Sequence, residues 1–368
     1  MAQGQVMITG GDGYLGRQVA RRYLEQTEAM IVLWVHATSQ EQFTVKQQQV
    51  VGELGASGTR VRFCYGDLVQ EHPFQDVAPT EVHTIIHAAA VTRFNVDEET
   101  ARKVNIEGTE KLLDFAGGCP ALRAFGLLST VYASGLKAGR IDEVAFDGRE
   151  GFTNHYERSK WAAETALLTR FDHLPWRIFR IATAIADDES GAVSQQNAFH
   201  NTLKLFFYGL LSLIPGKPQT PLYFVTGRFA ADAVFELMQQ AANHQIYHVA
   251  HTKEESLSLG ALIDLAFETF MQEEDFKLRR ILKPLWTDAE AFDLLAEGVH
   301  SFGGGVVNQA VSSVAPFARQ LFVDKEIRND HLASELKAYR APDARRLMQN
   351  TCEYLVRMRW GRPTQHAA

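Results

Sequence analysis

Residues 6–16 read VMITGGDGYLG, and this stretch decides the fold. An apolar run leads straight into Gly10, Gly13 and Gly16, and a segment of helical periodicity follows. At this spacing the first glycine permits a tight turn, the second lets the backbone approach a pyrophosphate, and the third lets helix and strand pack closely. The free N–H groups and partial positive charge of the helix N-terminus then favour the phosphates. We therefore predict a dinucleotide-binding loop made by Thr9, Gly10, Gly13, Tyr14, Leu15 and Gly16.

Further apolar runs of strand length alternate with helical segments through the first half of the chain. This alternation indicates βαβ units and a doubly wound parallel α/β sheet of Rossmann type, which binds ligands at the carboxyl ends of its strands. We expect a dinucleotide-binding domain over residues 1–185. A smaller, partly interleaved substrate-binding region would cover residues 186–368, with segments near 223–250 returning to the Rossmann core. The strand-like runs are residues 6–9, 31–35, 61–65, 84–88, 125–128 and 176–181.

Composition and charge limit the class of protein. The 368 residues carry a net charge of -7, which argues against a nucleic-acid partner because phosphate neutralisation needs a basic face. Few residues precede the first apolar run, and the longest apolar stretch, near residues 203–214, is too short to span a bilayer. We expect a cytoplasmic protein with no transmembrane segment. Neither Cys64, Cys119 and Cys352 nor His244, His248 and His251 have the spacing of a metal site, so no metal is predicted.

The end of the second strand bears on the choice of cofactor. That strand ends at His36, where an acidic residue would bind the 2′-hydroxyl of NAD, and no carboxylate follows until Glu41. A missing carboxylate removes repulsion toward a 2′-phosphate, and His36 could contact it, although histidine clamps a phosphate less well than arginine. The sequence therefore favours NADPH over NADH.

A second motif, Tyr156-x-x-x-Lys160, opens a helical segment. Positions i and i+4 share one helix face, so the phenol and the ammonium point into the same space. A free phenol has a pKa of ~10, and a nearby ammonium favours its ionised form, which suits general acid–base chemistry. Ser129 and Thr130 end the fifth strand, where a hydroxyl would hold the substrate oxygen, and Asn105 lies in the helix before it. The motif alone is common by chance, but the order of these groups on a dinucleotide-binding frame favours a catalytic set.

On these residues the chain resembles an extended short-chain dehydrogenase/reductase over about its first 185 residues. Residues 9–16 match TGxxGxxG, residues 66–68 are similar to the adenine-binding segment, and residues 87–90 are similar to the cofactor-lining turn. The resemblance implies that Thr130 polarises the carbonyl, with Ser129 as its rival. It adds to the cofactor site Asp67, Leu68, His87, Ala88, Ala89, Tyr156, Ile181 and Lys160, which would hold the nicotinamide ribose.

Within this family, the chain looks like the fatty acyl-CoA reductase and carrier-bound thioester reductase branch. The similar stretches are residues 86–94, 129–132 and 156–164. The chain departs from the family in having Ile181-Ala182 after Arg180, where members usually carry Arg-Pro. It also has His36 where the acyl reductases commonly show arginine.

The resemblance implies an NAD(P)H-dependent oxidoreductase that transfers hydride to a carbonyl. The substrate would be an acyl thioester or derived aldehyde of an apolar molecule, free or bound to an acyl carrier protein or coenzyme A. Three alternatives stay open: a secondary-alcohol dehydrogenase similar to 3β-hydroxysteroid enzymes, a nucleotide-sugar epimerase or dehydratase, and a non-catalytic dinucleotide-binding regulator. A homodimer is also left open. The cations Lys277, Arg279, Arg280 and Lys283 could meet a coenzyme A phosphate or an acidic carrier protein, or form a solvated helix face.

Two segments of the second half have expected structures. The apolar residues 199–214 could line a lipid-binding pocket or form a buried core helix. The tail over residues 333–358 has the pattern of a helix.

Overall fold

The computed structural model describes residues 4–55, 60–240, 242–301 and 311–361. Its largest element is a seven-stranded sheet with the order β12-β7-β5-β4-β1-β2-β3, in which all neighbouring strands are parallel. This confirms the predicted doubly wound α/β fold of Rossmann type. The strands are β1 (Gln5–Thr9), β2 (Ile31–His36), β3 (Val61–Gly66), β4 (Val82–His87), β5 (Ala124–Thr130), β7 (Trp176–Ile181) and β12 (Gln245–Val249).

The register brings the carboxyl ends of the strands to one edge of the sheet. Thr9 at the end of β1 lies beside Trp34 of β2 and His87 of β4, and Thr130 at the end of β5 lies beside Ile181 of β7. The order of the strands reverses between β1 and β4, which is where a doubly wound sheet opens a crevice for ligands.

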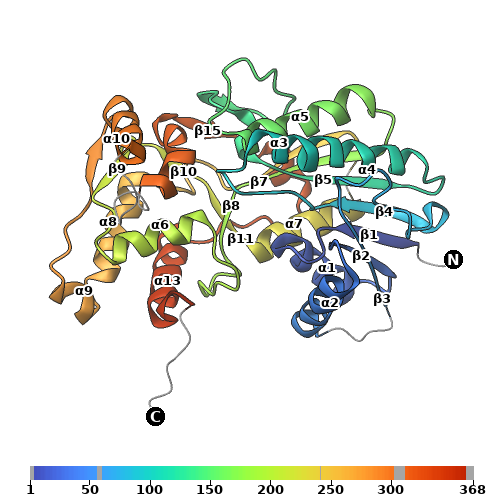
Figure 1. Ribbon diagram of the computed structural model, residues 1–368, viewed down its shortest axis with the longest axis horizontal. Helices are drawn as coiled ribbons and strands as arrows, with labels where there is room; N and C mark the ends of the chain where they lie inside the picture. The colour runs from blue at the N-terminus through green and yellow to red at the C-terminus, as the bar shows by residue number, and fades with distance from the viewer. Residues whose placement is uncertain (1–3, 56–59, 241, 302–310, 362–368) are drawn as a thin grey trace, which may run out of the picture.

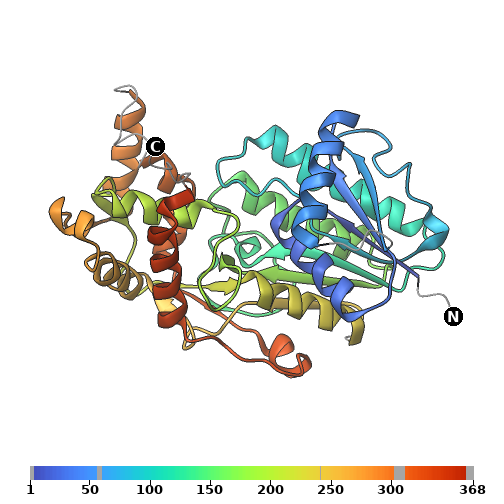
Figure 2. The ribbon, with the colours of Figure 1, turned by 90° about the horizontal axis from the view of Figure 1, so that it is seen from below.

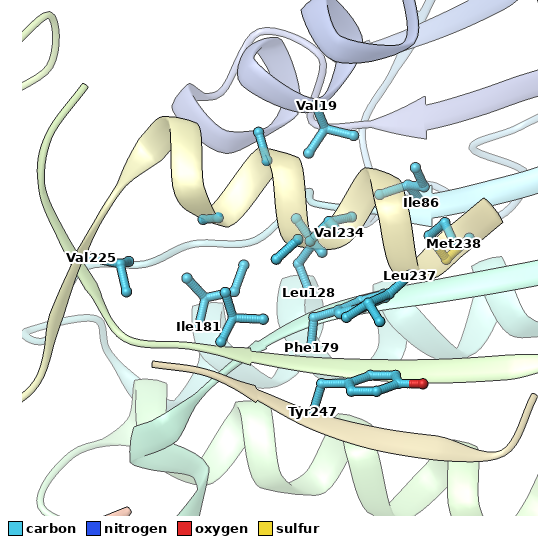
Figure 3. Packing of buried hydrophobic residues seen from close by; sticks show 14 of the residues in the cluster. Val19, Ile86, Leu128, Phe179, Ile181, Val225, Val234, Leu237, Met238 and Tyr247 are labelled. Atoms are coloured by element: carbon cyan, nitrogen blue, oxygen red, sulfur yellow. The ribbon is translucent and has the colours of Figure 1, made fainter. Parts of the chain in front are cut away.

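Helices cover both faces of the sheet (Figures 1 and 2). One face carries α1 (Tyr14–Gln26), α2 (Gln40–Leu54) and α7 (Gly227–Gln240). The other carries the π-helical segment η2 (Ala101–Glu107), α4 (Gly108–Gly117) and α5 (His155–Arg170). Figure 3 shows the first face, where Val234, Leu237 and Met238 of α7 pack toward Leu128 and Phe179 of the sheet. Because α7 and β12 come late in the chain, the second half returns to the Rossmann sheet.

A second lobe lies at the other end of the molecule (Figure 1). Its core is an apolar cluster in which Leu203, Phe206 and Phe207 of α6 are buried. Of the two expectations for residues 199–214, the buried core helix is therefore the one observed for α6. The helices of this lobe are α6 (Ala198–Phe207), α8 (Leu259–Phe270), α9 (Glu274–Leu278), α10 (Ala289–Ser301) and α13 (Ala344–Arg357).

The predicted helix over residues 333–358 is wrong as a single element. The structure has α12 (Asp330–Glu335) and α13, separated by an irregular segment. Pro342 lies in that segment and disfavours helical backbone in the residue before it. The side chain of Asp343 then accepts a hydrogen bond from the backbone N–H of Arg346 and caps the start of α13.

Short strand pairs and turns connect the two lobes.

Within the described ranges, no helix is long and apolar enough to cross a membrane. The remaining elements are η1 (Pro79–Glu81), α3 (Glu98–Thr100), η3 (Val131–Ser134), β6 (Gly139–Ile141), β8 (Thr183–Ala186), β9 (Leu213–Pro215), β10 (Pro221–Leu222), β11 (Phe224–Thr226), β13 (Leu257–Ser258), β14 (Leu285–Thr287), η4 (Ala315–Phe322), β15 (Lys325–Ile327) and η5 (Arg359–Gly361).

Candidate active site

The glycine loop links β1 to α1 and leaves the N-terminus of that helix free. Gly13 is the N-cap residue, it has no side-chain cap, and the first turn of α1 contains no acidic residue. Gly10 has a φ of +69°, and a Cβ there would lie 2.7 Å from the backbone nitrogen of Ala89. A Cβ at Gly13 would contact only the backbone oxygen of Gly10, at 3.1 Å. The loop thus offers uncompensated N–H groups and open space, which fit the pyrophosphate of a dinucleotide.

Tyr14 fixes the start of α1 against the second lobe. Its hydroxyl lies 3.2 Å from the backbone oxygen of Ala186, the last residue of β8, and 2.9 Å from Oδ1 of Asp187, which follows it. Leu15 packs on the core beneath the loop. The glycine loop is therefore held from both sides, and a bound cofactor would meet Tyr14 and Leu15 mainly through their backbone.

Positively and negatively charged side chains lie together at the end of β2. Nζ of Lys46 lies 2.6 Å from Oδ2 of Asp12 and donates to the backbone oxygen of His36 at 2.7 Å. Nε2 of His36 lies 3.3 Å from Oδ2 of Asp67. Sequence reasoning placed His36 and Asp67 here but missed Lys46 and Asp12, because α2 supplies the lysine and the glycine loop supplies the carboxylate.

The side chain of His87 lies inside the protein between two threonines. Its Nδ1 is 2.7 Å from the hydroxyl of Thr9, and its Nε2 is 2.9 Å from the hydroxyl of Thr109. The Thr109 hydroxyl donates to the backbone oxygen of Asn105, so it accepts from His87, whose proton is then on Nε2. Burial lowers the pKa of His87 to about 3, so the ring is neutral. A cofactor would meet the turn at Ala88 and Ala89 rather than this ring.

Leu68 lies beside the same edge of the sheet but is buried. Its backbone oxygen accepts a hydrogen bond from Nζ of Lys111 at 3.0 Å, and Gly108 approaches it so closely that a Cβ there would lie 2.7 Å from Cβ of Leu68. The segment after β3 is therefore fixed in place by α4.

Tyr156 of α5 lies near Thr130, the last residue of β5. The side chain of Tyr156 is buried. Burial raises the pKa of Tyr156, and the neighbouring Thr130 side chain opposes the rise. The ring of Phe94 packs edge-on against Tyr156 with centroids 5.7 Å apart. The phenol is therefore neutral and protonated at physiological pH, in an apolar enclosure.

Lys160 and Ser129 lie beneath this pair. Nζ of Lys160 donates to the backbone oxygen of Leu128 at 2.6 Å. Burial lowers the pKa of Lys160 to about 8, and Glu164 opposes this shift. The Ser129 hydroxyl donates to Glu164 and so is directed away from Tyr156. Of the two rival hydroxyl residues, Thr130 is the one near the phenol, because the Ser129 hydroxyl is bonded to Glu164.

Asn105 holds the backbone around Tyr156 in place. It lies in η2, a π-helical segment of the kind often found at functional sites. Its side chain accepts from the backbone nitrogen of Val91 at 2.8 Å and donates to the backbone oxygen of Val91 at 2.9 Å. It also donates to the hydroxyl of Ser159 at 2.9 Å, which in turn donates to the backbone oxygen of Tyr156.

The C-terminal lobe covers the site through η4 and β15. Nε2 of Gln320 donates to Glu157 at 2.9 Å, and Nδ2 of Asn154 donates to the backbone oxygen of Pro316 at 2.9 Å. The ring of Phe317 lies 5.7 Å from that of Phe94. Sequence reasoning missed this cover, since no motif marks residues so far along the chain as neighbours of Tyr156.

The structure thus brings the glycine loop, Thr130, Tyr156, Lys160 and Ile181 to one edge of the sheet, with Asn105 and His87 as buried supports. Within residues 4–55, 60–240, 242–301 and 311–361, no group of three His, Cys, Asp or Glu side chains could hold a metal ion. This arrangement would allow a proton transfer from Tyr156 beside a bound dinucleotide.

Comparison with known families agrees with this geometry. The family model described as male sterility protein matches residues 8–234, more than half of the chain. The chain belongs to the male sterility protein family. This family membership confirms the predicted extended short-chain dehydrogenase/reductase of NAD(P)-dependent type, related to fatty acyl-CoA and thioester reductases.

Curated relatives match this male sterility family member over part of their length. A linear gramicidin synthase of Brevibacillus parabrevis is 27% identical over 52% of the chain, which spans 4% of that protein. Fatty acyl-CoA reductase 2 of Arabidopsis thaliana is 27% identical over 38% of the chain, which spans 26% of that protein. Mouse 3 beta-hydroxysteroid dehydrogenase type 7 is 29% identical over 29% of the chain and 28% of its own length. The chain therefore spans about a quarter or less of the length of the first two.

Solved structures share the fold over nearly the whole chain. The terminal R domain from the myxalamid PKS-NRPS biosynthetic pathway has a TM-score of 0.76 at 18% identity, covering 98% of this chain and 92% of that one. UDP-glucuronic acid 4-epimerase from Bacillus cereus in complex with NAD has a TM-score of 0.66 at 14% identity, covering 96% and 99%. At these identities the likeness establishes the fold of this family member and not its substrate.

Proposed function

We propose that this chain reduces the carbonyl of an apolar acyl thioester or of the derived aldehyde, with NADPH as cofactor. The observation that carries the proposal is the buried phenol of Tyr156, near Thr130 at the end of β5 and one helical turn before Lys160 in α5. The relatedness to a fatty acyl-CoA reductase supports the thioester class.

NADPH, when bound at the glycine loop, would supply the hydride. Thr130 and Tyr156 would hold the carbonyl oxygen, and Tyr156 would donate its proton as negative charge develops on that oxygen. For a thioester, the carbon–sulfur bond of the resulting hemithioacetal then breaks and the thiol leaves, so that the product is the aldehyde. The raised pKa of Tyr156 suits this direction, because the phenol is protonated before the reaction. The ammonium of Lys160 beneath it lowers the cost of the phenolate that remains.

The 2′-phosphate of NADPH would lie at the corner formed by His36, Lys46 and Asp12. Lys46 brings a positive charge to this corner, and it already pairs with Asp12. The carboxylate of Asp12 would otherwise repel the phosphate and favour NADH. This corner supports NADPH as the preferred cofactor through Lys46.

The surface around Lys277, Arg279, Arg280 and Lys283 is our candidate for docking an acidic carrier domain. Leu278 and Leu282 lie among these cations and are 76% and 82% exposed. Exposed leucines interleaved with cations suit a partner that is acidic and presents an apolar patch. Replacing Arg280 by Glu should raise the KM for a carrier-bound thioester and leave the KM for a free pantetheine thioester unchanged. Arg123→Glu, an exposed arginine at the amino end of β5, is the matched control.

The test of the reaction is single-turnover NADPH oxidation with acyl-CoAs, acyl-pantetheines, fatty aldehydes, a ketosteroid and a UDP-sugar. We expect thioesters or aldehydes to react, and Tyr156→Phe to slow the hydride step about 10²–10⁴-fold without weakening NADPH binding. Tyr23→Phe, which removes a buried phenol between α1 and α7, is the matched control. Near-wild-type rates in Tyr156→Phe would reject the proton-transfer assignment, and turnover of the ketosteroid alone would favour the secondary-alcohol dehydrogenase.

A further inference from the structure

Gln320 of η4 bridges the two segments that carry Thr130 and Tyr156. Its amide nitrogen Nε2 donates to Oε2 of Glu157 at 2.9 Å and to the backbone oxygen of Gly135 at 3.1 Å. A backbone carbonyl only accepts hydrogen bonds, so the amide nitrogen rather than the amide oxygen faces this pair of partners. The residue is 7% exposed. One buried side chain of the C-terminal lobe therefore binds two elements of the Rossmann domain at once.

On the α5 side, the bridge meets the turn that presents Tyr156. Tyr156 is the second residue of α5 and lies between the N-cap residue Asn154 and Glu157. The side chain of Asn154 accepts a hydrogen bond from the backbone nitrogen of Glu157 at 2.9 Å, and Oε2 of Glu157 accepts one from the backbone nitrogen of Thr153 at 3.0 Å. The residues on either side of Tyr156 are thus bonded to each other, and the Gln320 amide fixes the whole turn in place.

On the β5 side, the bridge meets the turn that follows Thr130. The hydroxyl of Thr130 accepts a hydrogen bond from the backbone nitrogen of Tyr132 at 3.3 Å, at the start of η3. Gly135 is the C-cap residue of the same short helix, and its backbone oxygen also accepts a hydrogen bond from Nζ of Lys325 in β15. Of these two donors from the C-terminal lobe, Gln320 is the one that also donates to α5.

We propose that Gln320 is a positioning residue that sets the separation of the Tyr156 phenol and the Thr130 hydroxyl. The proposal rests on the function proposed for these two residues and deepens it, since the geometry of proton transfer then depends on a side chain of the C-terminal lobe. A misplacement of about 1 Å can slow a reaction about 100-fold. Loss of the bridge should lower the rate rather than the affinity for NADPH, because the segments that it joins are α5 and the end of η3 rather than the glycine loop.

The test compares Gln320→Leu with Asn329→Leu, a matched control from the same lobe. Nδ2 of Asn329 also donates to two oxygens, the backbone oxygen of Ala250 at 2.8 Å and the hydroxyl of Tyr339 at 3.0 Å, and the residue is 3% exposed. Both variants should lower the Tm, because each leaves buried acceptors without a donor. Gln320→Leu should slow the single-turnover hydride step about 10–100-fold at unchanged NADPH affinity, whereas Asn329→Leu should leave that rate unchanged.

Two readouts separate positioning from a merely structural role. In the Tyr156→Phe background, Gln320→Leu should slow the hydride step no further, because the group that it positions is gone. In protein with an isotope label on the Cζ atom of tyrosine, the Tyr156 NMR signal is assigned by its loss in Tyr156→Phe. This signal should shift in Gln320→Leu and stay in place in Asn329→Leu. Rate losses that multiply in the double variant, or a Tyr156 signal that does not move, would overturn the proposal.

Gln320→Asn carries the same test if Gln320→Leu does not fold, since it keeps the amide but withdraws it by one methylene from its two acceptors. Lys325 still donates to Gly135 in both variants, so the C-terminal lobe stays attached to η3. The tyrosine signal needs no substrate. A chain that reduces neither thioesters nor aldehydes would therefore refute the proposed function, while the Tyr156 signal would still decide the role of Gln320.

Discussion

The variants Gly13→Ala and Gly16→Ala should have opposite effects on protein stability and on cofactor binding, although only three positions separate the two glycines. At Gly13 the backbone has φ −84° and ψ 163°, which any residue can adopt, and the new methyl group would contact one atom at 3.1 Å. Losing a glycine N-cap costs some stability, and restricting the unfolded chain returns a similar amount. The free energy of unfolding of Gly13→Ala should therefore stay within about 1 kcal/mol of the wild type.

At Gly16 the same methyl group would meet the backbone of the loop itself. It would lie 2.8 Å from the carbonyl carbon of Gly10 and closer still to its oxygen, where real Cβ atoms keep beyond 3.0 Å. Either the loop or the helix must shift, and overpacking of this kind costs about 1–3 kcal/mol. Gly16→Ala should therefore lower the Tm by a few degrees.

Cofactor binding should be affected in the reverse order, with the larger loss of affinity in Gly13→Ala. The methyl group of Gly13→Ala stands where the pyrophosphate must approach, so NADPH affinity should fall at least about 100-fold, or roughly 2.8 kcal/mol, in a folded protein. Thermal unfolding and fluorescence titration of both variants provide the assay. Full affinity in folded Gly13→Ala would refute the placement of the pyrophosphate, and wild-type stability in Gly16→Ala would refute the packing role of Gly16.

Three other variants test the site. Thr130→Ala should lower turnover about 10–100-fold with unchanged NADPH affinity. Ser129→Ala loses only a hydrogen bond to Glu164 and should change the rate by less than about threefold. Single-turnover rates that reverse this order would make Ser129 the carbonyl ligand. Lys46→Met should weaken NADPH binding about tenfold and NADH binding much less, because it removes a charge-assisted contact and exposes the phosphate to Asp12. Paired dissociation constants decide this, and equal losses for both cofactors would move the 2′-phosphate elsewhere. Lys160→Met should both weaken NADPH binding and slow proton transfer, and a loss confined to the rate would remove the lysine from the cofactor site.

Much of the fold follows from local pattern. Each of the six strands expected from apolar runs is present in the parallel sheet, and the glycine spacing locates the turn after β1. These features are local, because a buried strand or a phosphate turn needs only a short run of sequence. The seventh strand, β12, joins the sheet from residues 245–249 beside β7, a pairing that depends on the path of the whole chain.

The candidate site was less predictable in its supporting residues. Glu164 lies one helical turn beyond Lys160 in α5, and Arg180 lies inside the fully buried strand β7. A charged residue in an apolar strand is a signal that a partner of opposite charge exists. That signal does not name the partner, which is 16 residues away on another element. Thr109, Lys46 and Phe317 carry no signal of their own, because their roles arise from tertiary contacts.

The contacts of η4 and β15 with α5 have a consequence for the order in which the protein is made. On the ribosome, the glycine loop and α5 emerge long before residues 315–327, so the reactive tyrosine exists for a time without its cover. The sheet is incomplete over the same interval, since α7 and β12 follow it in the chain. A nascent chain therefore presents its glycine loop early and gains the cover over Tyr156 only after residues 315–327 have been made.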